Sequence, residues 1–383
     1  METDMFEDIL ATVRTFVHKE VVPREQEIEE TDSIPEDIRR KAAAIGLFGY
    51  ALPEEYGGMG FTMYEDVRLA MELGRTTPAF RSMISTNNGI AGQVVARYGT
   101  NEQKENYLPR LASGELVGSF ALTEVDAGSD PTGLRTTAVR DGDHYILRGT
   151  KRYITNAPLA GVFMVFARTD PSSTGTKGIS VIAVDADSPG LTVGPHDKKM
   201  GQSGAWTSEL FFDDVRVPVD NVIGGEEGKG FAAAMGALSR GRLHVGALCV
   251  GIGERLLEES VRAATVITQG GKSIGEFQLI QAMLAESKTE LAAGKAMALA
   301  AAVEYDAGRD TKMGPSTTKL FCSEMVGRVA DRAVQIHGGL GYMRSVPVER
   351  LYRDVRLFRI YEGTSEIQKL IIARQLLKDA PNQ

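Results

Sequence analysis

The fold class of this chain rests on a central segment that reads Thr136-Thr137-Ala138-Val139-Arg140-Asp141-Gly142-Asp143-His144-Tyr145-Ile146-Leu147. Both halves of the segment are rich in β-branched and aromatic residues, which are typical of strands. The Asp-Gly pair between them is a strong tight-turn signal, because glycine adopts a positive φ without steric cost. The segment therefore predicts a β-hairpin.

Strand patterns continue on the C-terminal side of this hairpin, and helical patterns lie beyond them on both sides. Further strands are expected at Val162 to Ala167, Ile179 to Val184 and Glu209 to Val217. Helical periodicity marks the N-terminal third, and long runs rich in alanine, leucine and methionine follow Gly228, at 231–265, 277–307 and 315–338. We therefore predict an α+β protein with a helical domain at 1–117, a β domain at 118–228 and a helical domain at 229–383.

Composition narrows the class of protein. The 383 residues are 43% hydrophobic and carry a formal net charge of −8, with basic residues scattered, so a nucleic-acid partner is not expected. The two cysteines do not form a disulfide framework. Neither they nor the five histidines have a spacing typical of metal ligands, so no metal is expected. Met1 to Asp8 is acidic and polar, and no apolar run is long enough to span a membrane. We expect a cytoplasmic protein.

Three motifs carry a family resemblance. Residues 121–130 read ALTEVDAGSD, residues 335–342 read QIHGGLGY and continue through 347–350 (PVER) to Arg353-Asp354, and residues 361–364 read YEGT. In this order and over a chain of this length, they resemble the acyl-CoA dehydrogenase family. The resemblance implies a helical N-terminal domain, a central β-barrel-like domain and a C-terminal four-helix bundle, usually in a homotetramer or dimer.

The activity that the resemblance implies is FAD-dependent α,β-dehydrogenation of an acyl-CoA thioester to the trans-2-enoyl-CoA, with electrons leaving through an electron-transfer flavoprotein. Glu362 matches the family's base, which takes the α-proton while the β-hydride goes to flavin N5. Removal of a weakly acidic α-proton needs such a base and a polarised thioester carbonyl. A plainer interpretation of Glu362 is an acidic residue that merely suits the positive end of the next helix.

The remaining site residues follow from the same resemblance. Positions matching FAD contacts are Thr123, Ser129, Tyr153, Thr155, Gln335, Gly339, Thr364 and Glu366, of which Gln335 and Gly339 match a stretch that reaches the cofactor of a neighbouring subunit. Positions matching substrate contacts are Arg81, Ser129, Arg242, Tyr361 and Gly363. Some family branches carry their base on the helix that opens near residue 240, but the matching position here is Gly241.

Arg81 bears on the substrate. It lies where glutaryl-CoA dehydrogenases and sulfinopropionyl-CoA desulfinases carry an arginine, and a buried arginine needs an anionic partner. Gly74 stands where the glutaryl enzymes have a further glutamate, while the desulfinases lack the catalytic glutamate. A short acyl chain with a carboxylated or polar end fits Arg81. An arginine that only pairs with a nearby acid is the plainer alternative.

Two departures from the family pattern concern the cofactor. The family often has an Arg-x-x-Phe-Gly motif whose arginine grips FAD across a dimer, and here Ile267 and Gly270 replace its arginine and phenylalanine. Two alternatives to the dehydrogenase stay open, and these two departures motivate the second of them. One is a flavin-bound lyase, decarboxylase or desulfinase that uses the same enolate chemistry without net redox change, and the other is an FAD-poor homologue that binds acyl-CoA.

Overall fold

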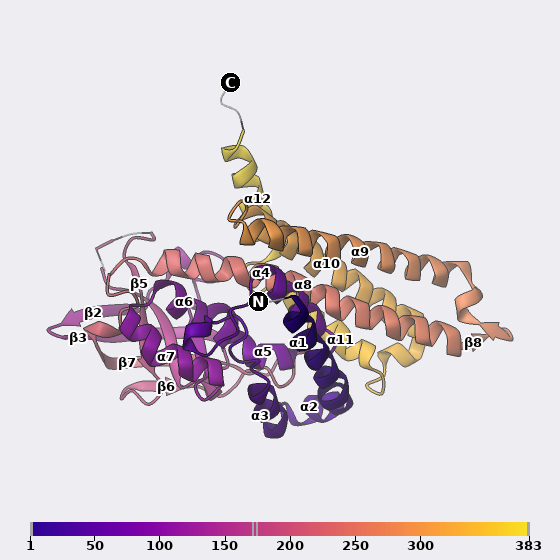
Figure 1. The fold of residues 1–383 in the computed structure, drawn as a ribbon, viewed down its shortest axis with the longest axis horizontal. Coiled ribbons are helices and arrows are strands. Elements are labelled where there is room, and N and C mark those ends of the chain that lie inside the picture. The colour runs from indigo at the N-terminus through magenta and orange to yellow at the C-terminus, as the bar shows by residue number, and fades with distance from the viewer. Residues whose placement is uncertain (1–2, 171, 174, 381–383) are drawn as a thin grey trace.

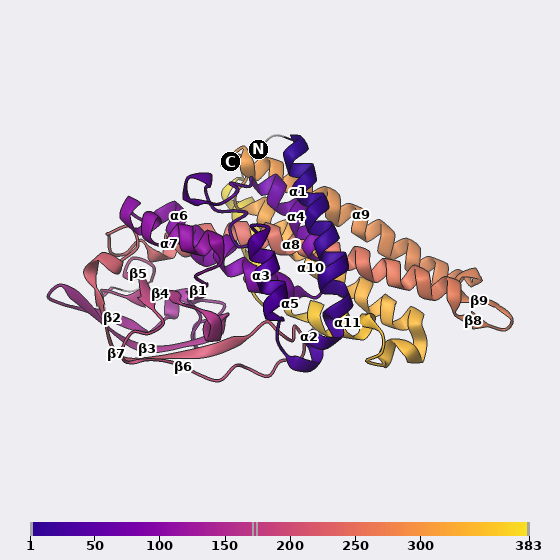
Figure 2. The same ribbon diagram turned by 60° about the horizontal axis from the view of Figure 1, so that its bottom comes forward.

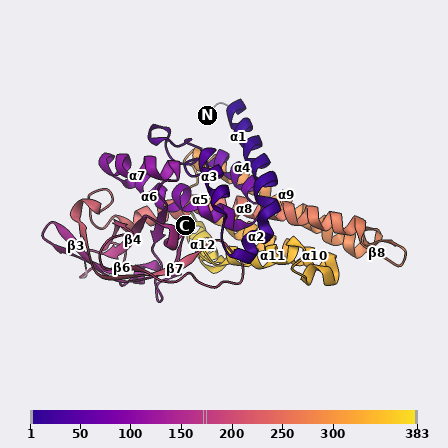
Figure 3. The same ribbon diagram turned by 90° about the horizontal axis from the view of Figure 1, so that it is seen from below.

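A computed structural model describes residues 3–170, 172–173 and 175–380. Figure 1 shows the β sheet at one end of an elongated molecule and a pair of long helices reaching the other end. Figure 2 and Figure 3 show the same separation from two further directions. Helices near the N-terminus, such as α1 and α4, lie in the middle of the molecule, while α6 and α7 lie beside the β sheet. The predicted α–β–α architecture is confirmed.

The described N-terminal region contains seven α-helices, with a longer connection between α3 and α4 and short π-helices after α1 and α5. They are α1 (Thr3–Phe16), α2 (Glu25–Thr31), α3 (Glu36–Ala44), α4 (Met63–Leu73), α5 (Pro78–Ser85), α6 (Ala91–Tyr98) and α7 (Asn101–Ser113). Helix α4 begins at a capping box formed by Thr62 and Glu65, and α5 begins with Pro78 after the cap residue Thr77. Both starts are thus fixed by local sequence, and these two helices carry side chains into the site described below.

The sheet contains seven strands, ordered β1-β4-β2-β3-β7-β6 with β5 paired to β4. The strands are β1 (Gly118–Ala121), β2 (Thr137–Asp141), β3 (His144–Thr155), β4 (Val162–Arg168), β5 (Ile179–Asp185), β6 (Leu191–Val193) and β7 (Thr207–Pro218). The predicted hairpin is present as β2 and β3, with Asp141 opposite His144 and Gly142 at φ 63° in the turn. Strands β4 and β5 are apolar and buried along almost their whole length, as suits the centre of a packed β domain.

The C-terminal region is again helical, and its long helices match the predicted runs within a few residues. They are α8 (Gly230–Val266), α9 (Gln278–Asp306), α10 (Met313–His337), α11 (Pro347–Val355) and α12 (Ser365–Lys378). Helices α8, α9 and α10 lie side by side, and a short hairpin of β8 (Thr268–Gln269) and β9 (Lys272–Ser273) joins α8 to α9 at the far end (Figure 1).

Helix α8 joins the N-terminal and C-terminal regions through one shared apolar core. It approaches α4 closely at Gly74 and Gly251, where a Cβ on Gly74 would lie 2.5 Å from the Leu248 carbonyl oxygen. No side chain fits at Gly74 in this packing, so the departure from the glutaryl enzymes at this position has a steric reason. Among the described residues, no helix is both long and apolar enough to cross a membrane.

Candidate functional site

A cavity of about 1450 Å³ lies where the N-terminal helices, strand β3, helix α8 and the start of α12 meet. Ten of the thirteen predicted site residues line it: Arg81, Thr123, Ser129, Tyr153, Thr155, Arg242, Tyr361, Glu362, Gly363 and Thr364. Gln335, Gly339 and Glu366 do not line this cavity and are exposed. For Gln335 and Gly339, exposure agrees with the prediction that they serve a neighbouring subunit, which remains a prediction.

Glu362 lies in a strained turn just before α12. Its φ of 54° is unusual for a residue with a Cβ, and Gly363 follows at φ 88°. Thr364 then caps the helix by accepting a hydrogen bond from Ile367 N at 3.3 Å. This geometry directs the Glu362 carboxylate into the cavity, and its Oε2 has no hydrogen-bond partner. Among the described residues, Glu362 Oε2 is therefore a buried carboxylate oxygen whose hydrogen-bonding capacity is unused.

Helix α8 passes the Glu362 carboxylate at Gly241. A Cβ at this position would lie 2.1 Å from Glu362 Oε2, closer than any real contact. Glycine is therefore required at position 241 for a steric reason, because any larger residue would push the carboxylate out of its present position.

We expect Gly241→Ala to lower turnover about hundredfold, since an ~1 Å displacement of a reacting group can cost about 10²-fold. Steady-state kinetics of the purified variant measure this. Gly253→Ala is the matched control, because it adds a methyl group to the same helix against a side chain, 2.5 Å from Leu291 Cδ2. If both variants lost turnover equally, the effect would belong to helix packing rather than to Glu362.

Arg81 faces Glu362 from helix α5. Its Nη2 lies 3.7 Å from Glu362 Oε1, and its Nε has no hydrogen-bond partner. Although burial alone would lower the pKa of Arg81, the nearby Tyr361 and Glu362 outweigh this effect and the net direction is upward. Arg81 is only 5% exposed. It is therefore a buried cation with one long ion pair to a nearby acid, as in the plainer alternative, and its role toward an acyl tail stays a prediction.

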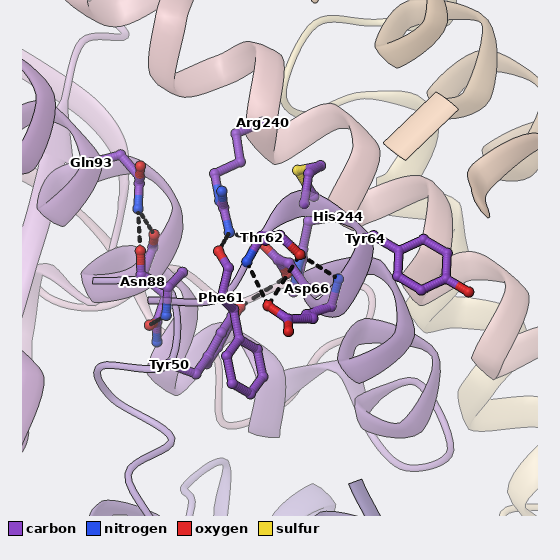
Figure 4. Close-up of polar contacts among 12 residues, drawn as sticks. Tyr50, Phe61, Thr62, Tyr64, Asp66, Asn88, Gln93, Arg240 and His244 are labelled. Atoms are coloured by element: carbon purple, nitrogen blue, oxygen red, sulfur yellow. Dashed lines mark hydrogen bonds and ion pairs between the residues drawn. The ribbon is translucent and has the colours of Figure 1, made fainter. Parts of the chain in front are cut away.

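Next to Arg81 the cavity wall holds a buried polar network that our sequence analysis missed. Asp66 on α4 accepts from His244 Nδ1 at 2.6 Å and pairs with Arg240 Nη2 at 2.8 Å, and both partners come from α8 (Figure 4). Burial would raise the pKa of Asp66, but Arg240 and His244 hold it below its usual value. Tyr50 OH lies 3.5 Å from the same His244 nitrogen. The i, i+4 spacing of Arg240 and His244 was the sequence signal for this network, but no feature of the sequence pairs these two residues with Asp66.

Tyr361 adds a further unpartnered polar atom. Among the described residues its buried hydroxyl makes no hydrogen bond of normal geometry, although the Gln202 side chain acts on it. Burial dominates and raises the pKa of Tyr361 far above its ordinary value. Together with Arg81 Nε and Glu362 Oε2, this hydroxyl makes one side of the cavity rich in unsatisfied hydrogen-bonding atoms. Buried polar groups without partners are costly unless a ligand completes them.

Another part of the cavity wall is formed by strand β3 and by the loop between β1 and β2. Tyr153 has φ 56°, is 61% exposed and lies under the Arg152 guanidinium, whose carbon is 4.9 Å from the ring centroid. Buried Glu124 fixes the loop because it accepts from Lys151 Nζ at 2.7 Å and from two backbone amides. This side therefore offers an exposed aromatic ring on a rigidly held backbone, together with the hydroxyls of Thr123 and Ser129.

The loop at 197–202 also lines the cavity and is attached to α11 by Asp354. The buried Asp354 carboxylate accepts from the Gln202 backbone amide, and Gln202 Nε2 donates to the Asp354 carbonyl at 3.1 Å. Burial raises the pKa of Asp354 to about 7. The folded protein thus favours the protonated form of this carboxyl group.

A pH dependence of stability follows from Asp354. Its folded-state pKa lies above the ordinary 3.8, so the native state binds more protons than the unfolded state between about pH 4 and 7. This group's contribution to the free energy of unfolding therefore falls as pH rises through that window, by up to about 4 kcal/mol. Urea unfolding at pH 5 and pH 8 measures this. The free energy of unfolding of Asp354→Asn minus that of wild type should be larger at pH 8 than at pH 5. An equal difference at both pH values would refute this.

Comparisons with known proteins agree with this geometry. The chain matches the acyl-CoA dehydrogenase N-terminal domain over residues 3–115, the middle domain over 119–215 and the C-terminal domain over 228–377. It is 43% identical over 367 residues to acryloyl-CoA reductase (NADH) of Anaerotignum propionicum, covering 95% of this chain and 92% of that one.

Two further relatives are similar over nearly the whole length. The caffeyl-CoA reductase-Etf complex subunit CarC of Acetobacterium woodii is 40% identical over 366 residues, covering 95% of this chain and 96% of the relative. The structure of butyryl-CoA dehydrogenase from Megasphaera elsdenii superimposes with a TM-score of 0.94 at 34% identity, over 98% of this chain and 99% of the other. The chain belongs to the acyl-CoA dehydrogenase family.

Proposed function

We propose that this protein interconverts a short acyl-CoA thioester and its trans-2-enoyl-CoA, with FAD as cofactor and Glu362 as the base at the α-carbon. The observation that carries the proposal is the Glu362 carboxylate, held in the cavity with one oxygen unpartnered and Gly241 leaving it room. Relatives named as reductases and as dehydrogenases support both directions of one reaction. The relative named as part of an Etf complex supports an electron-transfer flavoprotein as partner.

The cavity residues fit an isoalloxazine ring. The exposed Tyr153 ring offers a stacking surface, and Thr123, Ser129, Thr155 and Thr364 offer hydroxyl groups around it, in a cavity large enough for the ring and a thioester together. When bound, FAD supplies the acceptor for the β-hydride. These residues of the chain would hold the cofactor, with Gln335, Gly339 and Glu366 proposed to act from or toward a second subunit.

The chain's own part in the reaction is proton transfer and positioning. Glu362 Oε2 takes the α-proton, and the backbone N–H of Glu362 donates to the thioester oxygen as it gains negative charge. Arg242, buried on α8, donates from Nε to the Glu362 carbonyl at 3.4 Å and so supports this turn. Tyr361 and Gly363 border the acyl chain on either side of the base.

Arg81 supports a more specific substrate, a short acyl chain with a carboxylate or another strongly polar end. A carboxylated tail would pair with Arg81, which has only the long contact to Glu362 in the described structure. The pairing would satisfy the buried guanidinium and leave the Glu362 carboxylate free for the α-proton. A neutral tail would leave Arg81 competing for the base.

An anaerobic visible-spectrum titration with butyryl-CoA and glutaryl-CoA tests the proposal. Bleaching of the oxidised flavin band by either thioester is the expected result, and bleaching at lower concentrations of glutaryl-CoA is expected if Arg81 binds the tail. A flavin band that persists with both thioesters would reject this activity. If turnover instead needs no external electron acceptor, the protein is a lyase or decarboxylase that uses the same base.

Cofactor retention offers a separate test at Ile267. The β8–β9 hairpin next to Ile267 lies at the end of the molecule opposite the β sheet (Figure 1), and Ile267 does not line the cavity, so its family contact with FAD would require a second copy of the chain. Gly270 and Gly271 both have positive φ, 60° and 82°, which explains glycine where the family has phenylalanine.

We expect Ile267→Arg to tighten FAD binding roughly tenfold to hundredfold, because a hydrogen bond to a charged group contributes about 1.5–3 kcal/mol. Flavin per chain after extensive dialysis measures the change. Thr268→Arg, one residue further on in an exposed position, is the control. Unchanged retention in Ile267→Arg would show that no cofactor phosphate comes within reach of this position.

A further inference from the structure

The strained turn at Glu362 is held by donors from three different helices. Arg242 on α8 and Gln368 on α12 donate to the Glu362 carbonyl, at 3.4 and 3.2 Å. Gln368 Nε2 also donates to the Gly363 carbonyl at 3.0 Å, and Lys319 Nζ on α10 donates to the same oxygen at 2.7 Å. A residue that has a Cβ keeps a left-handed conformation only where its surroundings enforce it. These donors supply that constraint.

Lys319 is the unusual member of this set. Its side chain is fully buried, and among the described residues no ion pair includes it. Burying an ammonium group without a carboxylate partner is costly, so packing alone does not explain why the Lys319 ammonium is buried against Gly363. The contact fixes the peptide that follows Gly363, and with it the backbone on the C-terminal side of Glu362.

We propose that Lys319 is a positioning residue for the Glu362 carboxylate, and that it acts through the Gly363 carbonyl. The inference rests on the proposed role of Glu362 as base. The ammonium donates to the Gly363 carbonyl, and Lys319 is not among the residues that line the cavity.

The protonation state of Lys319 adds a signature that a purely structural residue would lack. Burial lowers the pKa of Lys319 to about 8, while the carboxylates of Glu362 and Glu324 act to raise it and Arg242 acts to lower it. The Cys249 thiol is neutral, because burial raises its pKa well above the ordinary value, so it places no charge beside Lys319. The charged form of Lys319 is therefore lost as pH rises through about 8, and the carbonyl contact weakens with it.

The test compares Lys319→Met, which removes the donor at similar length, with Lys319→Gln, which keeps a neutral donor. We expect kcat to fall about tenfold to hundredfold in Lys319→Met and less in Lys319→Gln, with KM for butyryl-CoA within twofold of wild type. The wild-type fall in kcat as pH rises above about 8 should be absent from Lys319→Met. Unchanged kcat, or a loss seen in KM alone, would overturn the proposal.

Ser365→Ala is the matched control. Ser365 Oγ donates to Glu324 Oε1 at 2.6 Å and so also links α12 to α10, but it contacts neither carbonyl of the turn. It should change thermal stability without changing kcat or its pH profile. A loss of kcat in Ser365→Ala equal to that in Lys319→Met would assign the effect to helix docking and overturn the proposal.

Two further variants cover the cases in which Lys319→Met alone would not decide the question. If Lys319→Met does not fold, Gln368→Met removes the other side-chain donor to the Gly363 carbonyl and should lower kcat in the same way, and an unchanged kcat there would overturn the proposal. Glu362→Gln separates the two claims. Full activity in Glu362→Gln would reject the proposed function itself, whereas an inactive Glu362→Gln with a fully active Lys319→Met would reject only the positioning role.

Discussion

Replacing Glu362 by glutamine should lower the rate of anaerobic flavin reduction by an acyl-CoA about 10²- to 10⁴-fold, because the amide cannot accept the α-proton. The substitution keeps the size of the side chain and the backbone donors to its turn, so the fold and thioester binding should persist. Stopped-flow absorbance of the flavin band measures the rate, and a binding titration measures the affinity separately.

The control for this variant is Glu304→Gln, which changes an exposed carboxylate on α9 that pairs with Arg309 at 2.7 Å. It should reduce its flavin at the wild-type rate. Gly241 occupies the alternative position for a base on α8, and the nearby Asp66 is already bound by Arg240 and His244. A Glu362→Gln enzyme that retained the wild-type rate would require a base outside this account.

Replacing Arg81 by methionine should separate charged from neutral acyl chains. Truncating one partner of a buried charge pair costs about 2–5 kcal/mol, so kcat/KM for glutaryl-CoA should fall roughly thirtyfold or more. The value for butyryl-CoA should not fall, because that acyl chain offers Arg81 no charge and the substitution removes the competition of Arg81 for the Glu362 carboxylate. Parallel steady-state assays of the two thioesters measure the ratio.

Arg110→Met is the control for Arg81, since Arg110 is an exposed arginine on α7 that pairs with Glu115 at 2.9 Å. It should leave both substrates unaffected. Equal losses on glutaryl-CoA and butyryl-CoA in Arg81→Met would remove the tail-binding role and leave Arg81 as an ion-pair partner of Glu362.

Local patterns in the sequence were sufficient to predict the architecture. The strand–turn–strand pattern around Gly142 and the long apolar helices after Gly228 depend on neighbouring residues, and both are present as predicted. The motif around Glu362 could be recognised because its residues are consecutive. Ten predicted site residues line one cavity. They could be predicted because each lies in a short stretch of sequence that matches the family.

The contacts that complete the site depend on helices far apart in the chain. Asp66 and His244 are separated by 178 residues, and Lys319 contacts the carbonyl of a residue 44 positions later. No local pattern indicates such pairs, because they follow from how α4, α8, α10 and α12 pack. The positive φ of Glu362 was equally hidden, since glutamate gives no sequence signal for a left-handed backbone.

The central claim, that Glu362 removes the α-proton of an acyl-CoA, is tested most directly by hydrogen exchange at that carbon. The purified holoenzyme is incubated anaerobically with butyryl-CoA in D₂O, and the recovered thioester is analysed by mass spectrometry and NMR. We predict deuterium at the α-carbon with wild type and essentially none with Glu362→Gln over the same time. Exchange at the wild-type rate in Glu362→Gln would contradict the claim.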